Sequence, residues 1–108
     1  MKRLYGSKLK IERKKEMDRQ VTKEEVPSYE LVEEKIKEID GSIIILRIFY
    51  IFMQIVYKFQ VIKNDKLCTV EIPRKLLEGL RNRNILLEEE LNEILNTSLQ
   101  QSECWNKV

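Results

Sequence analysis

Residues 43–62 read IIILRIFYIFMQIVYKFQVI, the longest apolar stretch in the chain and the one on which its fold depends. Nine of these twenty residues are Ile or Val and five are Phe or Tyr, a composition that favours β-strand. Apolar and polar residues alternate in the second half, so we predict two strands, about 43–52 and 55–63. No Gly, Pro, Asn or Asp marks a turn near Met53-Gln54, which leaves one long bent strand as an alternative.

The same stretch also has the length of a transmembrane helix, which is a third interpretation. Arg47 would lie inside such a span at a cost of about 3 kcal/mol, and Gln54, Lys58 and Gln60 would add to that cost. The excess of β-branched residues also fits a strand better than a helix. A membrane partner through residues 43–62 is therefore not expected.

The chain beyond this stretch predicts one more strand and two helices. Lys63-Asn64-Asp65-Lys66 is a polar turn, and residues 67–72 alternate as the third strand of an antiparallel meander. On that strand Cys68, Val70 and Ile72 would share one face, with Thr69 and Glu71 on the other. Pro73 ends the strand, and the spacing of Leu and Ile predicts helices over 74–84 and 87–101.

A helix with a break is predicted before the apolar stretch, over residues 22–40. Thr22 and Glu25 have the spacing of a capping box, and Pro27 interrupts the segment. From Tyr29 onward apolar residues recur every three or four positions, and Asp40-Gly41 ends the helix. Ser28 is a second candidate for the N-cap.

The predicted fold class is therefore α+β. A basic, flexible N-terminal arm (1–20) precedes a single α+β domain (21–108) with one helix, a three-stranded antiparallel meander and two C-terminal helices. The expected core comprises Val32, Ile36, Ile44, Ile48, Phe52, Tyr57, Phe59, Val70, Ile72, Leu77, Leu80, Leu91, Ile94 and Leu95. Residues 43–52 are apolar on nearly both faces, and an apolar face left uncovered usually meets a partner. We therefore expect a dimer or higher homo-oligomer.

Charge is distributed unevenly along the 108 residues, whose formal net charge is +2. The first twenty residues hold eight Lys or Arg and three acidic residues, whereas residues 21–42 hold seven acidic residues and three basic ones. The N-terminal segment is thus a cationic arm on a nearly neutral body. A solvated tail with no binding role is an equally simple interpretation of such a segment.

The cysteines predict a reducing compartment. The chain has two, Cys68 and Cys104, without a CxxC pair or an even framework of four or six. Cys68 is expected to be buried in the third strand, and Cys104 lies beside Trp105 near the C-terminus. No apolar signal segment opens the sequence, so a cytoplasmic location is expected.

Several common chemistries lack the residues they need. The chain has no histidine and no Gly-rich phosphate-binding loop, since its three glycines lie far apart. Glu88, Glu89 and Glu90 form an acidic run, but they open the last predicted helix, where negative charge suits the helix dipole. We expect neither enzymatic activity nor a cofactor or metal.

Residues 68–99 resemble the ribbon-helix-helix family of DNA-binding proteins. The resemblance lies in CTVEIPRKLLEGL (68–80) followed by ELNEIL (90–95), a strand, a Pro, a helix, a short turn and a second helix. It implies an intertwined dimer of the antitoxin or repressor type, whose paired strands enter the DNA major groove.

Two functions remain open at this point: a dimeric nucleic-acid-binding or transcription-regulatory protein, and a protein–protein interaction or assembly subunit without a nucleic-acid role. Nucleic acid and an acidic protein are both candidate partners of the arm. The residues that could contact nucleic acid are Lys2, Arg3, Lys8, Lys10, Arg13, Lys14, Lys15, Arg19, Thr69, Arg74, Lys75, Arg81 and Arg83. One contiguous basic face would favour nucleic acid, and dispersed charge would favour protein interaction.

Overall fold

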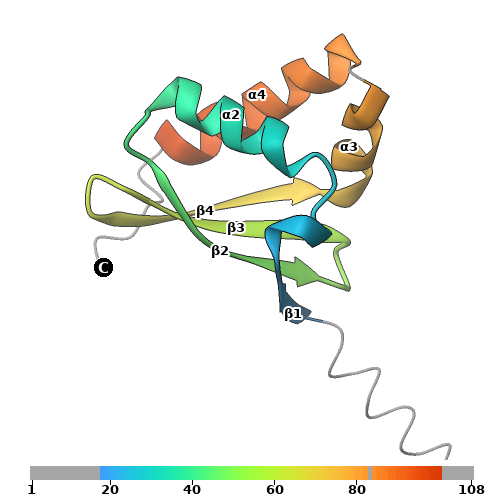
Figure 1. The fold of residues 1–108 in the computed structure, drawn as a ribbon, viewed down its shortest axis with the longest axis horizontal. Helices are drawn as coiled ribbons and strands as arrows, with labels where there is room; N and C mark the ends of the chain where they lie inside the picture. The colour runs from blue at the N-terminus through green and yellow to red at the C-terminus, as the bar shows by residue number, and fades with distance from the viewer. Residues whose placement is uncertain (1–17, 83, 101–108) are drawn as a thin grey trace, which may run out of the picture.

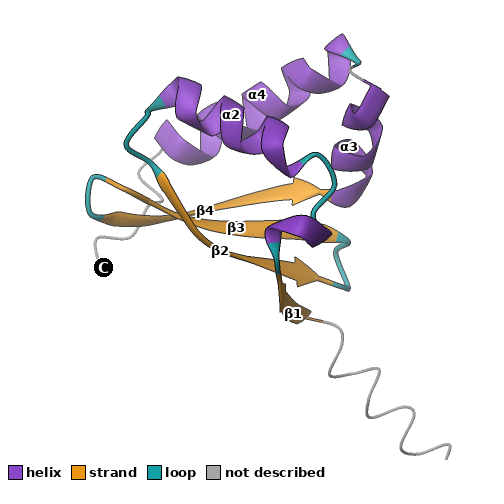
Figure 2. Ribbon diagram, in the orientation of Figure 1, coloured by secondary structure: helices purple, strands orange, loops and turns teal. Residues whose placement is uncertain are grey.

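The computed structural model describes residues 18–82 and 84–100. In this part of the chain a four-stranded antiparallel sheet, in the order β1-β2-β3-β4, is combined with helices (Figure 1). The elements are β1 (Asp18–Val21), the 3-10 turn η1 (Lys23–Glu25), α2 (Tyr29–Ile39), β2 (Ile44–Ile51), β3 (Val56–Lys63), β4 (Lys66–Pro73), α3 (Arg74–Gly79), the 3-10 turn η2 (Leu80–Asn82) and α4 (Ile85–Gln100). Figure 2 shows α2, α3 and α4 on one face of the sheet; none of the described elements covers the other face.

The apolar stretch forms the hairpin β2–β3, so the two-strand prediction is confirmed, and the single bent strand and the membrane helix are wrong. β3 continues into β4 through Asn64 and Asp65, which have φ values of 52° and 64°. Asn and Asp tolerate such left-handed conformations, which two-residue hairpin turns require. No helix among the described residues is long and apolar enough to cross a membrane.

β1 is a strand that the sequence pattern does not predict. Its four residues, DRQV, pair with Ile48–Ile51 of β2, and only Val21 is buried. A polar segment this short becomes a strand because β2 offers it a free edge, not because of its own propensity. The predicted meander of three strands therefore corresponds to β2–β4 of a four-stranded sheet. The end of the predicted arm, residues 18–20, belongs to that sheet.

The segment before α2 is shorter than predicted but keeps the predicted cap. η1 carries the capping box, in which the backbone N–H of Thr22 donates to Glu25 Oε1 at 2.8 Å. This hydrogen bond is the main cause that holds the pKa of Glu25 below its usual value. Ser28 precedes α2 in a left-handed conformation, and its hydroxyl donates to the carbonyl of Leu77 at 2.8 Å instead of capping its own helix.

The two predicted C-terminal helices are present, but the first is shorter. Residues 74–84 divide into α3 and η2, and α4 begins at Ile85. A Cβ on Gly79 would lie 2.6 Å from Leu87 Cδ1, so glycine permits the close approach of α3 and α4. At the other end of α4, Lys63 Nζ donates to the carbonyl of Leu99 at 2.9 Å and satisfies an unpaired helix-end acceptor.

The hydrophobic core lies between the sheet and the helix layer, and most of its predicted members are buried there. Confirmed members are Val32, Ile36, Ile48, Tyr57, Phe59, Val70, Ile72, Leu77, Leu80, Leu91 and Leu95. Ile94 is only partly buried against this core. The predictions for Ile44 and Phe52 are wrong, because 56% of Ile44 and 52% of Phe52 are exposed.

A β-bulge explains the error at Ile44. The register shifts between Ile45 and Arg47, so Leu46 is an extra residue in β2. One extra residue moves the alternation to the opposite face, as slips of one residue do in any strand. Ile48 therefore faces the helices, whereas Ile44 faces away from them.

Candidate protein-interaction surface

One face of the sheet points away from the helices and carries side chains from all four strands. Side chains alternate along each strand, and the register of the four strands places them in rows. We call this surface the open face. It consists of Asp18, Gln20, Ile44, Arg47, Phe49, Ile51, Val56, Lys58, Gln60, Ile62, Leu67, Thr69, Glu71 and Pro73.

The open face has apolar rows at both ends. At one end, Ile44, Ile62 and Leu67 lie side by side on β2, β3 and β4. At the other end, Ile51 and Val56 lie side by side on β2 and β3. Antiparallel sheets with one solvated face normally carry polar residues on that face. Rows of apolar side chains are therefore unusual there.

An apolar tip lies beyond the end of the sheet, next to the row of Ile51 and Val56. The tip consists of Phe52, Met53 and Ile55 in the β2–β3 turn, with exposed fractions of 52%, 70% and 53%. Ile55 has a φ of 54°, a left-handed conformation that is rare for a β-branched residue. Its carbonyl accepts a hydrogen bond from the backbone N–H of Arg74 at 3.0 Å, which ties the turn to the start of α3.

Charge on the open face is balanced. Arg47 and Lys58 lie on the two central strands, while Asp18 and Glu71 lie on the two outer strands. Phe49 lies in the same row as Lys58 and Glu71. The middle of the face is therefore polar and mixed in sign, with an aromatic side chain among the charges.

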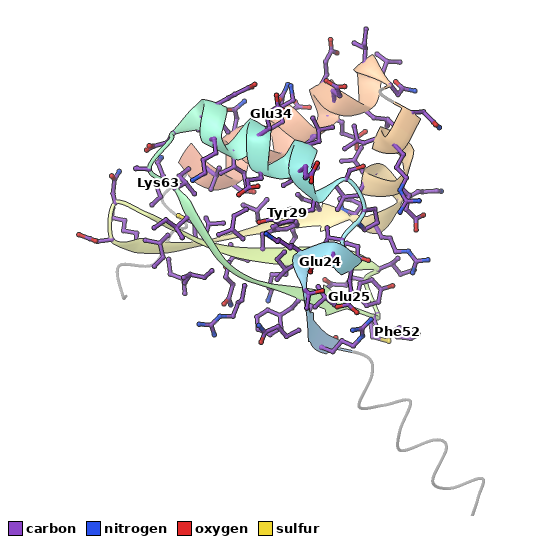
Figure 3. All side chains as sticks on the ribbon, viewed as in Figure 1. Glu24, Glu25, Tyr29, Glu34, Phe52 and Lys63 are labelled. Atoms are coloured by element: carbon purple, nitrogen blue, oxygen red, sulfur yellow. The ribbon has the colours of Figure 1, made fainter. Side chains whose placement is uncertain are left out.

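The helix layer is acidic by comparison. Helices α2 and α4 together contain eight Glu and two Lys, and α4 has no Lys or Arg along its length. Lys35 of α2 is one of the two, and its Nζ lies 3.7 Å from Glu88 Oε1 of α4. Figure 3 labels Glu34 on α2, and Glu24 and Glu25 on η1. Over all described residues, fifteen Asp or Glu outnumber eleven Lys or Arg.

The residues predicted to contact nucleic acid do not form one basic face in the described part of the chain. Thr69 lies on the open face, whereas Arg19 lies on the helix side and pairs with Glu25 at 3.5 Å. Arg74 and Lys75 are exposed at the start of α3, and Arg81 is exposed in η2 at the end of this segment. Lys2, Arg3, Lys8, Lys10, Arg13, Lys14, Lys15 and Arg83 lie outside the described residues.

Arg74 forms one contact within its own helix and one with β2. Its Nε donates to Glu78 Oε2 at 2.9 Å, and its Nη1 donates to the Tyr50 hydroxyl at 3.1 Å. The guanidinium also lies 6.0 Å from the centre of the Tyr50 ring. Glu78, followed by Tyr50, raises the pKa of Arg74 above its usual value. This side chain thus links α3 to β2 rather than projecting freely toward a ligand.

An open acidic pocket of about 390 Å³ lies between η1 and the start of α2. Its lining includes Glu24, Glu30 and Glu33 around the ring of Tyr29. Burial raises the pKa of Tyr29, and the nearby Glu33 and Glu24 add to the shift. Within residues 18–82 and 84–100, no group of three or more His, Cys, Asp or Glu could hold a metal ion.

Cys68 is fully buried, as predicted, but it is disulfide-bonded rather than a free thiol. The chain's other cysteine, Cys104, lies outside the described residues. The cysteine pattern was the main support for a reducing compartment, and a disulfide-bonded Cys68 removes that support.

Within residues 18–82 and 84–100, the fold is therefore a two-layer α+β arrangement with helices on one face of the sheet and no described element on the other. Comparison of the chain with protein-family models, curated proteins and solved structures finds no match.

Proposed function

We propose that the protein is a protein-interaction or assembly subunit without enzymatic activity, and that a partner binds its open face. The observation that carries this proposal is the one-sided arrangement of α2, α3 and α4, which leaves the apolar rows of the sheet without a covering element among the described residues. Ile44 is 56% exposed, and the other Ile, Val and Leu side chains of these rows are partly exposed.

The cost of leaving this surface in water supports the proposal. Removal of apolar surface from water stabilises a protein or complex by about 25 cal/mol per Å². Exposed apolar residues scattered singly need no explanation, but a continuous patch usually marks an interface. Each apolar row spans neighbouring strands, and the row of Ile51 and Val56 borders the apolar tip, so a partner that covers these residues gains this stabilisation.

The charge of the open face favours a protein over a nucleic acid as its partner. Affinity for nucleic acid rests mainly on Lys and Arg side chains that neutralise phosphates. Arg47 and Lys58 are offset on this face by Asp18 and Glu71, and the described body carries more acids than bases. A polyanion would therefore find little net attraction on the body.

Site-specific photo-cross-linking tests the proposal. A benzophenone amino acid is placed at Ile44 on the open face or, as a matched control, at Ile85 in α4, which is 70% exposed. Irradiation in the native cell is expected to give a discrete cross-linked product from position 44 and none from position 85. Equal absence of products from both positions would contradict the proposal.

A second function, nucleic-acid binding by a dimeric regulator, is favoured by charge segregation along the chain. Residues 1–17 carry seven Lys or Arg and two acidic residues, and they join the fold at Asp18, at the edge of the sheet. β4, α3 and α4 also follow each other in the order of a ribbon-helix-helix module. β3 borders β4 on one side, so within the described residues only the outer edge of β4 is free to pair with a second copy.

A further inference from the structure

We propose that the partner of the open face is a second copy of this chain, packed face to face to form a two-fold symmetric sheet sandwich. This inference rests on the proposed function, since it names the partner that the open face binds. The second copy packs on the sheet face and not on the helix layer or the edge of β4.

The open face carries apolar side chains at its two ends and polar side chains between them. An apolar row containing Ile44 and Ile62 lies at one end, and one containing Ile51 and Val56 lies at the other. The two rows between them hold the charged and amide side chains, together with Phe49. The order along the strands is therefore apolar, polar, polar, apolar.

This order is self-complementary. A face-to-face copy must be related by a two-fold axis lying between the sheets, because a two-fold interface uses the same patch on both subunits. An axis along the strands exchanges β2 with β3, so Ile44 meets Ile62 of the second copy and Ile51 meets its Val56. An axis across the strands exchanges the two ends, and apolar rows again meet apolar rows.

The charges on the open face satisfy the same symmetry. With the axis along the strands, Lys58 lies opposite Phe49 of the second copy and Arg47 lies opposite its Gln60. With the axis across the strands, Arg47 lies opposite Phe49 and Glu71 opposite Thr69. In neither arrangement does a charged side chain lie directly opposite a like charge, which would oppose association.

The helix layer would not avoid contacts between like charges in the same way. A second copy placed on α2 and α4 would bring two surfaces together that each carry eight Glu and two Lys. Like charges across an interface disfavour association. The charge distribution thus selects the sheet face for self-association.

The size of the face is also adequate. Three strands of eight residues and one of four, at about 3.3 Å per residue and about 4.8 Å apart, give the sheet a projected area of about 440 Å². Upright side chains and the apolar tip increase the accessible area beyond this projected area. A standard interface buries roughly 800 Å² per partner, so the second copy must cover most of the open face together with the apolar tip. Two stacked sheets would also place the facing layers about 10 Å apart, as in β-sandwiches.

The mass of the purified full-length chain tests this inference. Light scattering at tens of micromolar is expected to give twice the 13.0 kDa of one chain. The double variant Ile44→Lys/Ile62→Lys places Lys in both members of one apolar row and is expected to be monomeric. The matched control Ile85→Lys makes the same change at an exposed apolar residue of the helix layer, and should remain dimeric. Circular dichroism melts check that both variants stay folded.

Two results would overturn the inference: a folded wild-type monomer at this concentration, or a dimer that survives Ile44→Lys/Ile62→Lys. Dependence of the dimer on Ile44 and Ile62, but not Ile85, supports it. The cross-linked product from position 44 separates this inference from the proposed function. A product of twice the chain mass supports both. A product with a different protein supports the proposed function and overturns the second copy, and absence of any product contradicts both.

Discussion

At the scale of single residues, Ile55 shows how the fold uses a position that local chemistry disfavours. Its φ of 54° lies in the left-handed region, which Asn or Gly normally occupies in turns. The pairing of β2 with β3 on one side and the bond from Arg74 N–H on the other determine this conformation. The same conformation at Asn64 and Asp65 falls on residues that accept it, so turn residues mark the β3–β4 turn in the sequence, whereas none marks the β2–β3 turn.

We predict that Ile55→Asn raises the free energy of unfolding by about 1 kcal/mol, because the left-handed conformation costs a non-Gly residue roughly 1–2 kcal/mol. Ile55 is 53% exposed, so little buried area is lost. Urea denaturation measures the change. The reciprocal control Asn64→Ile should lower stability by a similar amount. A less stable Ile55→Asn protein would show that the side chain contributes more than its backbone strain costs.

At the scale of elements, α4 is the helix whose apolar side closes the core over β4. Leu91, Leu95 and Leu99 are all essentially inaccessible to solvent, whereas Leu86 at the start of the same helix is 73% exposed. The contrast arises because positions four residues apart share one helix face, and only that face meets the sheet.

Leu91→Ala is expected to lower the free energy of unfolding by about 2–4 kcal/mol, through lost burial and the cavity that remains. Leu86→Ala in the same helix has the same chemistry without the burial and should change stability by less than about 0.5 kcal/mol. Thermal or urea melts of the two variants provide the comparison. Equal effects of both substitutions would place α4 elsewhere than on the sheet.

At the scale of the whole molecule, charge is separated between the N-terminal segment and the body. Residues 1–17 are strongly basic, while the described residues carry more acids than bases. Any affinity for nucleic acid should therefore depend on residues 1–17, and little of it should reside in Lys75 or Arg81 of the body.

If the protein binds duplex DNA, deletion of residues 1–17 should flatten the plot of log affinity against log salt by several units. Each phosphate contact contributes about 0.9 to that slope, and the deletion removes seven Lys or Arg. The deletion ends before β1, so the melting temperature should hardly change. A control chain with these seven residues replaced by Gln keeps the length without the charge. Mobility shifts that detect no binding by the full chain at low salt would end the nucleic-acid proposal.

Much of this fold was predictable because the signals are local. The hairpin within residues 43–62, the third strand, the capping box at Thr22 and the helix that ends at Asp40 all follow from periodicity and turn chemistry. Most of the core was predictable for the same reason. The hydrogen bond from Arg74 to Tyr50 was not, since that contact depends on how α3 packs beside β2.

The sequence by itself determined that β2, β3 and β4 are strands and that α2, α3 and α4 are helices, because hydrophobic period and turn residues act over a few positions. Only the tertiary structure decided which face of the sheet is covered. A single extra residue, Leu46, reverses the alternation in β2 and moves Ile44 from the expected core to the open face. β1 becomes a strand only because β2 offers it an edge. The candidate interface arises from these two non-local events, since burial depends on which elements meet and not on hydrophobicity alone.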